Sequence, residues 1–110
     1  MRLLVEKILT SAGYEVSTAS SGMAAMTAAR NERINLVVLD LSMPGIDGYS
    51  VCGMFKHLKD FKAPILVLSG RTGDKDIKQV LDTGADAFLA KPVNREDLLA
   101  KITELLNPPA

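Results

Sequence analysis

Three polar side chains in this sequence come directly after apolar runs, at positions where strands would end. They are Asp40 after Leu36–Leu39, Ser69 after Ile65–Leu68, and Lys91 after Ala87–Ala90. A carboxylate at the end of a strand can attack phosphorus or bind a cation, and it can equally cap a loop. A hydroxyl and an ammonium group beside it would offset the charge of an incoming phosphoryl group. The three residues therefore form a candidate site for phosphoryl transfer or cation binding.

The apolar pattern along the chain alternates between helical and strand spacing. We expect helices over residues 2–12, 20–31, 48–59, 74–83 and 94–106, and strands over 14–18, 35–40, 65–68 and 87–90. This αβαβαβαβα order predicts an α/β fold, with a parallel sheet covered by helices on both faces and joined by right-handed crossovers. Because such sheets bind ligands beyond the carboxyl ends of their strands, Asp40, Ser69 and Lys91 are expected at one edge.

Residue types at the ends of these segments support the same boundaries. Gly13 and Gly84 are expected to end helices, and Asn94 is expected to cap the last one. The continuous apolar run 65–68 predicts a strand buried on both faces. For the helix over 48–59, the spacing predicts a buried face made of Val51, Met54, Phe55 and Leu58.

Length and composition indicate one ordinary domain spanning residues 1–110. The 110 residues are 47% hydrophobic and 24% charged, and 13 basic side chains balance 13 acidic ones. A domain that binds nucleic acid by itself would show a basic surplus or a basic stripe, so we expect no such contact. No apolar run approaches the roughly 18 residues of a membrane span, and a lone Cys52 allows no internal disulfide. These features predict a cytoplasmic protein.

The sequence resembles the receiver domain of two-component response regulators over essentially its whole length. The resemblance rests on the segment Leu36–Gly48, the pair Ser69-Gly70 and the segment Gly84–Pro92, in this order and at this spacing. It implies a flavodoxin-like, doubly wound parallel sheet. It also implies a signalling phosphoprotein rather than an enzyme, which takes its phosphoryl group from a histidine kinase or a phosphotransfer protein.

The resemblance assigns roles to individual residues at the predicted strand ends. Asp40 corresponds to the phospho-acceptor, Ser69 to the hydroxyl that turns toward the phosphoryl group, and Lys91 to its charge partner. Phe88 corresponds to the aromatic side chain whose rotamer, inward or outward, reports the state of the domain.

The magnesium site that the resemblance implies is incomplete in these 110 residues. Ser42 falls where the family uses a backbone carbonyl as a Mg²⁺ ligand beside Asp40, and the side chains of Ser42 and Arg71 fall where phosphoryl lifetime is adjusted. The family's acidic pair, however, ends a strand that would precede residue 1, and the first carboxylate here is Glu6, within a predicted helix. Because Mg²⁺ prefers near-octahedral oxygen coordination, we expect weak or absent binding and impaired phosphorylation.

The same resemblance makes this an N-terminally truncated domain, because the strand before residue 1 is the central one in the family. Segments 14–18 and 35–40 would then close up and pair, or a second chain would cover the open edge, or the protein would start upstream. We expect a homodimer. A non-phosphorylated dimerisation or interaction module stays an alternative. An aspartate-nucleophile hydrolase of the haloacid dehalogenase kind and a flavodoxin-type cofactor binder are weaker ones.

Overall fold

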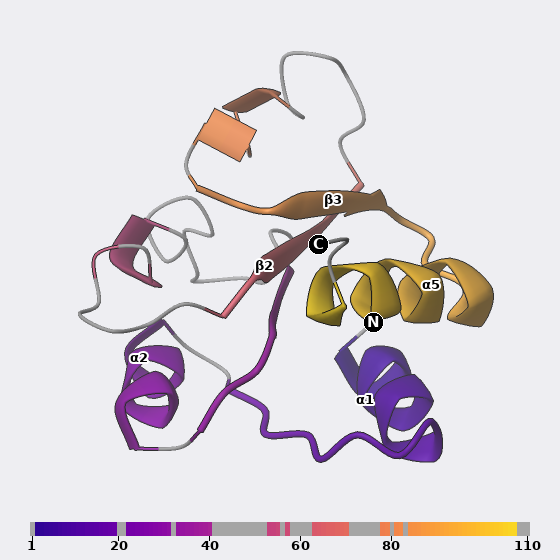
Figure 1. Cartoon of the computed structure of the whole chain (residues 1–110), viewed down its shortest axis with the longest axis horizontal. Helices are drawn as coiled ribbons and strands as arrows, with labels where there is room; N and C mark the ends of the chain where they lie inside the picture. The colour runs from indigo at the N-terminus through magenta and orange to yellow at the C-terminus, as the bar shows by residue number, and fades with distance from the viewer. Residues whose placement is uncertain are drawn as a thin grey trace.

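The computed structural model describes residues 2–19, 22–31, 33–40, 53–55, 57, 63–70, 78–79, 81–82 and 84–107. Its helices are α1 (Arg2–Ser11), α2 (Gly22–Asn31) and α5 (Arg95–Leu106), and its strands are β1 (Val37–Asp40), β2 (Ile65–Ser69) and β3 (Ala87–Ala90). Residues 53–55 and 57, and 78–79 and 81–82, are also helical and lie within the helices predicted over 48–59 and 74–83. The alternation of helices and strands is thus confirmed for these elements (Figure 1).

The described strands form one parallel sheet in the order β1-β2-β3. In the β1–β2 pair, Val37 lies opposite Ile65 and Asp40 opposite Leu68. In the β2–β3 pair, Leu66 lies opposite Ala87 and Ser69 opposite Ala90. Because all the strands run the same way, their carboxyl ends meet at one edge. This is the parallel α/β arrangement that the sequence predicts.

Strand β2 lies at the centre of the hydrophobic core, and all five of its residues are buried. Ile65 and Val67 pack in a cluster with Met26 of α2 and Phe55. Leu66 and Leu68 belong to a second cluster, which α1 and α5 share. Successive strand side chains point to opposite faces, so one apolar strand serves both layers. The predicted burial of 65–68 is confirmed.

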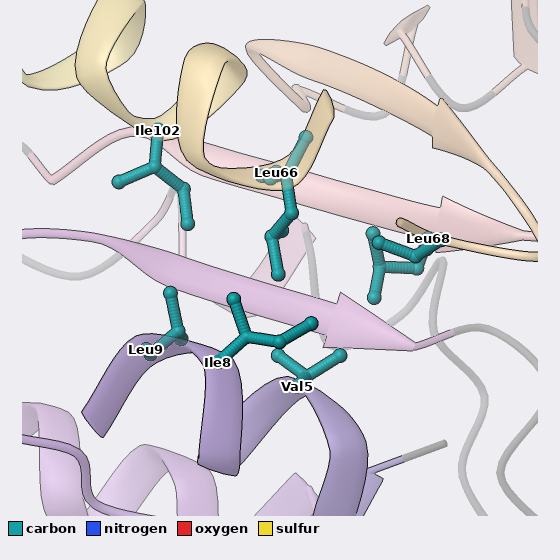
Figure 2. Packing of buried hydrophobic residues seen from close by; sticks show 8 residues of the cluster. Val5, Ile8, Leu9, Leu66, Leu68 and Ile102 are labelled. Atoms are coloured by element: carbon teal, nitrogen blue, oxygen red, sulfur yellow. The ribbon is translucent and has the colours of Figure 1, made fainter. Parts of the chain in front are cut away.

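The second cluster holds α1 and α5 to the same face of the sheet (Figure 1). Val5, Ile8 and Leu9 of α1 point toward Leu66 and Leu68, and Ile102 approaches them from α5 (Figure 2). The spacing of the three α1 residues is that of one helix face. Burying a side chain of this size contributes roughly 1.5–3 kcal/mol relative to leaving it exposed.

The helix ends follow the local signals predicted from the sequence. Gly13, just after α1, has φ 97°, and Gly84 has φ 111°, a region that favours glycine. Asn94 caps α5, because its Oδ1 accepts a hydrogen bond of 2.8 Å from the backbone N–H of Asp97. At the other end of α5, the backbone N–H of Asn107 donates to the carbonyl of Thr103 at 3.0 Å.

The strand predicted over residues 14–18 is wrong, because these residues belong to no strand in the structure. The N–H of Tyr14 donates to the carbonyl of Leu9 at 3.0 Å, and Tyr14 and Val16 pack partly buried against the cluster shared by α1 and α5. Among the described residues, β1 pairs with β2 alone. The segment 14–18 therefore finds no neighbouring strand, and a strand needs a partner for its backbone hydrogen bonds. Pairing of 14–18 with β1 does not occur here.

The buried face predicted for 48–59 is half right where it can be compared. Phe55 is 2% exposed, as expected, but Met54 is 47% exposed. Adjacent residues on an α-helix project about 100° apart, so packing of Phe55 into the core leaves Met54 toward solvent. The other two residues of that face, Val51 and Leu58, lie outside the described residues. Within the described part of the chain, no helix has the length and apolar character needed to cross a membrane.

Candidate functional site

The carboxyl ends of the three strands bring the predicted site positions to one edge of the sheet. Asp40 is the last residue of β1 and lies opposite Leu68 of β2. Ser69 is the last residue of β2 and lies opposite Ala90, the end of β3. The backbone N–H of Lys91 donates to the carbonyl of Ser69 at 3.0 Å, which continues the β2–β3 ladder by one bond. An acid and a hydroxyl residue thus end two neighbouring strands, and a basic residue directly follows the third.

Ser69 is held where the core meets this edge. It is 4% exposed, and it is the only buried polar residue among those the structure describes. By the alternation of strand side chains it shares a face with Ile65 and Val67, on the side covered by α2. Its position therefore depends on the same packing that buries the apolar part of β2.

Lys91 is held from both sides along the chain. Its backbone is bonded to Ser69 on one side, and Val93 is buried among α1 and α5 residues on the other. The Lys91–Pro92 peptide bond is cis. Asn94 then caps α5 directly. The half-buried Lys91 therefore occupies a short, anchored connection between a strand and a capped helix.

Of the other predicted site residues, the structure describes only some. Phe88 lies in β3 opposite Val67, is half-buried, and packs against the cluster that includes Met26 and Phe55. Ser42 and Arg71 lie outside the described residues, and so does the side chain of Asp40. The structure therefore brings together the backbone positions of Asp40, Ser69 and Lys91.

One residue with a defined contact was missed by the sequence reasoning. The carboxylate of Asp86, just before β3, accepts a hydrogen bond of 2.8 Å from the backbone N–H of Ile65. Its own N–H donates to the carbonyl of Ile65 at 2.9 Å. The two residues are 21 positions apart, and an acid after Gly84-Ala85 looks like an ordinary solvated side chain in sequence. No local signal could have found this contact.

The described residues do not complete a magnesium site. No three His, Cys, Asp or Glu side chains gather in this part of the chain in a way that could hold a metal ion. Asp40 contributes its place at the sheet edge, and Ser42 is outside the described residues. Mg²⁺ is generally bound by one or two carboxylates together with waters or phosphate, in strict octahedral geometry. Among the described residues, Asp40 is therefore the candidate that would contribute a carboxylate to such a site.

A carboxylate beside a hydroxyl and an ammonium group is suited to one chemistry in particular. The carboxylate can attack an electrophilic phosphorus, and the cation and the hydroxyl can stabilise the charge on the transferred oxygens. Placement at the ends of rigid strands limits how far these groups can drift, which favours a repeatable geometry.

Comparisons with known proteins identify the family of the chain. Residues 1–103 match the family described as the response regulator receiver domain. The transcriptional regulatory protein AfsQ1 of Streptomyces coelicolor is 38% identical over 106 residues, which are 96% of this chain and 46% of that protein. The transcriptional regulatory protein KdpE of Mycobacterium tuberculosis is 40% identical over 94 residues, which are 86% of this chain and 41% of that protein. The chain thus spans less than half the length of these two relatives.

Solved structures show the same fold. A CheY-like response regulator receiver domain protein from Methanospirillum hungatei superposes with a TM-score of 0.84 at 30% identity, covering 96% of this chain and 83% of that one. The receiver domain of the sensor histidine kinase PA1611 from Pseudomonas aeruginosa, which has a magnesium ion coordinated in its active site cleft, gives a TM-score of 0.86 at 26% identity. That match covers 96% of this chain and 87% of the PA1611 domain. With its parallel α/β sheet and a family match over residues 1–103, the chain belongs to the response regulator receiver domains of two-component signalling.

Proposed function

We propose that Asp40 accepts a phosphoryl group from a phosphohistidine on a histidine kinase or a phosphotransfer protein. A carboxylate oxygen of Asp40 forms the new bond to phosphorus, and the bond between phosphorus and the imidazole nitrogen breaks. The imidazole keeps the electron pair of that bond, and Asp40 becomes an aspartyl phosphate. The observation that carries this proposal is the alignment of Asp40, Ser69 and Lys91 at one sheet edge.

The neighbouring residues would bind and report the phosphoryl group. Lys91 would pair its ammonium group with the phosphoryl oxygens, and Ser69 would donate its hydroxyl to one of them. Phe88 would change rotamer between the two states, and Ser42 and Arg71 would set how long the phosphoryl group persists. The family to which the chain belongs, and the positions of Ser69 and Lys91 at the carboxyl ends of β2 and β3, support these proposed roles.

The wider role of the chain follows from its relatives. AfsQ1 and KdpE are named as transcriptional regulatory proteins, and both are more than twice as long as the region they share with this chain. We infer that the chain is a cytoplasmic signal-receiving part of a regulator of this kind, in which phosphorylation changes a surface rather than a substrate.

Phosphorylation of the 110-residue chain itself is proposed to be weak. The chain offers no acidic pair before α1, and its first carboxylate, Glu6, lies within α1. Without that pair, Asp40 and the backbone at Ser42 would leave most of the coordination of Mg²⁺ to water. The attacking carboxylate and the incoming phosphoryl group would then repel each other with little compensation.

Labelling with acetyl phosphate in millimolar Mg²⁺ tests both parts of this proposal. We expect little stable phospho-form of the 110-residue chain, measured by intact mass. A version carrying an added N-terminal strand that ends in two aspartates should gain one phosphoryl group per chain, and the label should be labile to hydroxylamine. In that version Asp40→Asn should abolish the label, whereas the matched control Asp82→Asn, at an exposed helical position, should leave it intact.

The assignment of Asp40 as the acceptor and the proposed impairment of phosphorylation can be refuted independently. Stoichiometric label on Asp40 of the 110-residue chain would overturn the proposed impairment and leave the acceptor assignment standing. Label that persists after Asp40→Asn would overturn the acceptor assignment.

A second candidate function is self-association without phosphorylation. It is favoured by β1, whose outer edge pairs with no other strand among the described residues. An open, apolar strand edge is a template for pairing with another chain. We propose a second copy of this chain as the partner, joined in a symmetric dimer.

Light scattering across a dilution series tests the dimer. We expect a mass of two chains at high micromolar concentration, falling toward one chain on dilution. A monomer throughout would refute the dimer. A dimer that is lost on substitutions at exposed positions of α5 would also count against the open edge as its cause.

A further inference from the structure

The β2–β3 ladder carries an unusual pair of bonds at its amino end. Ile65 gives its N–H to the carboxylate of Asp86 at 2.8 Å and takes the N–H of Asp86 on its carbonyl at 2.9 Å. Both backbone groups of Ile65 therefore face the segment that leads into β3. The backbone bond is one residue out of step with the ladder, in which Leu66 lies opposite Ala87 and the carbonyl of Ser69 accepts from Lys91, and in the other bond a side chain replaces a backbone carbonyl.

The contact matters because Ile65 is 0% exposed. A buried N–H that water cannot reach must find a partner inside the protein. The segment that leads into β3 turns at Gly84, whose φ is 111°, and the acceptor for the N–H of Ile65 comes from the side chain of Asp86. The carboxylate of Asp86 takes the place of the missing rung.

The hydrophobic pattern of β3 does not choose its register by itself, because both faces of the strand are apolar. Ala87, Phe88 and Leu89 are half-buried and Ala90 is exposed. Phe88 packs with the cluster that includes Met26, and Leu89 packs with the cluster shared by α1 and α5. A one-residue slip would exchange these apolar side chains between two apolar faces, so an additional contact is needed to select the register.

The two ends of this ladder are linked by its register. Ile65 pairs with Asp86 at one end, and the carbonyl of Ser69 takes the N–H of Lys91 at the other. The five residue steps from Asp86 to Lys91 span roughly 16 Å at the usual strand rise. The contact that holds Asp86 beside Ile65 therefore also determines which residue after β3 lies beside Ser69.

We propose that Asp86 is a positioning residue: its carboxylate pins the register of β3 on β2 and thereby sets Lys91 beside Ser69 at the opposite end of the sheet. The relevance of that position to phosphoryl transfer rests on the proposed function. The pinning itself does not, because it is a statement about backbone pairing.

Site-resolved amide hydrogen exchange of the 110-residue chain tests the pin. Asp86→Ala removes the Oδ2 acceptor, Asp86→Asn keeps a side-chain oxygen that can accept the same bond without the charge, and Asp82→Ala is the matched control at an exposed acid. We expect Asp86→Ala to speed exchange at Ile65 and, at least tenfold, at the distant Lys91. Exchange at Leu39 in β1 should stay native. Asp86→Asn should restore slow exchange at both Ile65 and Lys91.

The pattern of exchange decides the proposal. Fast exchange at Ile65 with native exchange at Lys91 would make Asp86 a local cap and overturn it. Equal acceleration at Leu39 would overturn it too, because the effect would then be one of overall stability. If Asp86→Ala does not fold, Asp86→Ser, whose hydroxyl is too short to reach Ile65, takes its place with the same expected pattern.

The measurement is separate from the phosphorylation test. Failure of Asp40 to take a phosphoryl group would leave these exchange rates as expected, and loss of the proposed pin would leave the identity of the acceptor untouched.

Discussion

The interior of β2 and its two ends are held by different forces. In the interior, Leu66, Val67 and Leu68 are at most 1% exposed and are packed by helices on both faces. At the ends, polar groups set the geometry, through Asp86 beside Ile65 and through Lys91 beside Ser69. The difference teaches that the core supplies the free energy of folding, while a few hydrogen bonds decide which residues meet at the edge.

The largest effect on stability is expected from the strand interior. Leu66→Ala leaves a cavity between β2 and the α1 and α5 side chains, and it should lower the free energy of unfolding by about 2–5 kcal/mol. Urea unfolding measures the change. The control Leu4→Ala, at a position 47% exposed on α1, should change stability by less than about 0.5 kcal/mol. Equal losses in the two variants would contradict the assignment of the core.

A smaller effect is expected at the carboxyl end of the same strand. Ser69→Ala removes a buried hydroxyl and should cost about 1–2 kcal/mol by urea unfolding. In the version with the added N-terminal strand, the same change should slow labelling by acetyl phosphate, and Ser69→Thr, which keeps the hydroxyl, should restore the rate. A stability loss as large as that of Leu66→Ala would erase the contrast between interior and end.

The cap of α5 tests the anchor that follows Lys91. Asn94→Ala removes the acceptor for the N–H of Asp97 and should destabilise the chain by about 1 kcal/mol. Asn94→Asp keeps an acceptor at that position and should recover most of the loss. Thermal unfolding of the three proteins side by side gives the comparison, and no recovery by Asp would argue against the cap as the cause.

The smallest effect is expected at a polar link between two helices. The guanidinium Nη1 of Arg95 donates to the hydroxyl of Ser11 at 2.6 Å, joining α5 to the end of α1. Because the link is exposed, Ser11→Ala should cost about 0.5 kcal/mol. In a double-mutant cycle with Arg95→Ala, the coupling energy should be similarly small. A coupling above about 2 kcal/mol would place this link among the main stabilising contacts.

Much of the fold could be predicted because its signals are local. The apolar run 65–68 predicted a buried strand, Asn94 predicted a cap, and Gly13 predicted the end of the first helix. Each depends on residues close together in the chain, so a short window contains the whole cause. The strand-end positions of Asp40, Ser69 and Lys91 follow from the same alternation, and the structure places their backbones at one edge.

Other features required the tertiary structure. The segment 14–18 has the composition of a strand but forms none, because strand formation depends on a partner and not on the segment alone. The periodicity of 48–59 could not show that Phe55 would be buried while Met54 stays exposed, since the direction of the helix face is set by what packs against it.

The sequence by itself determined which residues would end the strands, because apolar runs and turn residues are read locally. Only the tertiary structure decided which strand ends are fixed by hydrogen bonds and which residues supply those bonds. The bonds from Ile65 to Asp86 and from Arg95 to Ser11 join residues 21 and 84 positions apart. Such contacts leave no periodic trace in the chain, because they exist only after the layers have packed and brought the partners together.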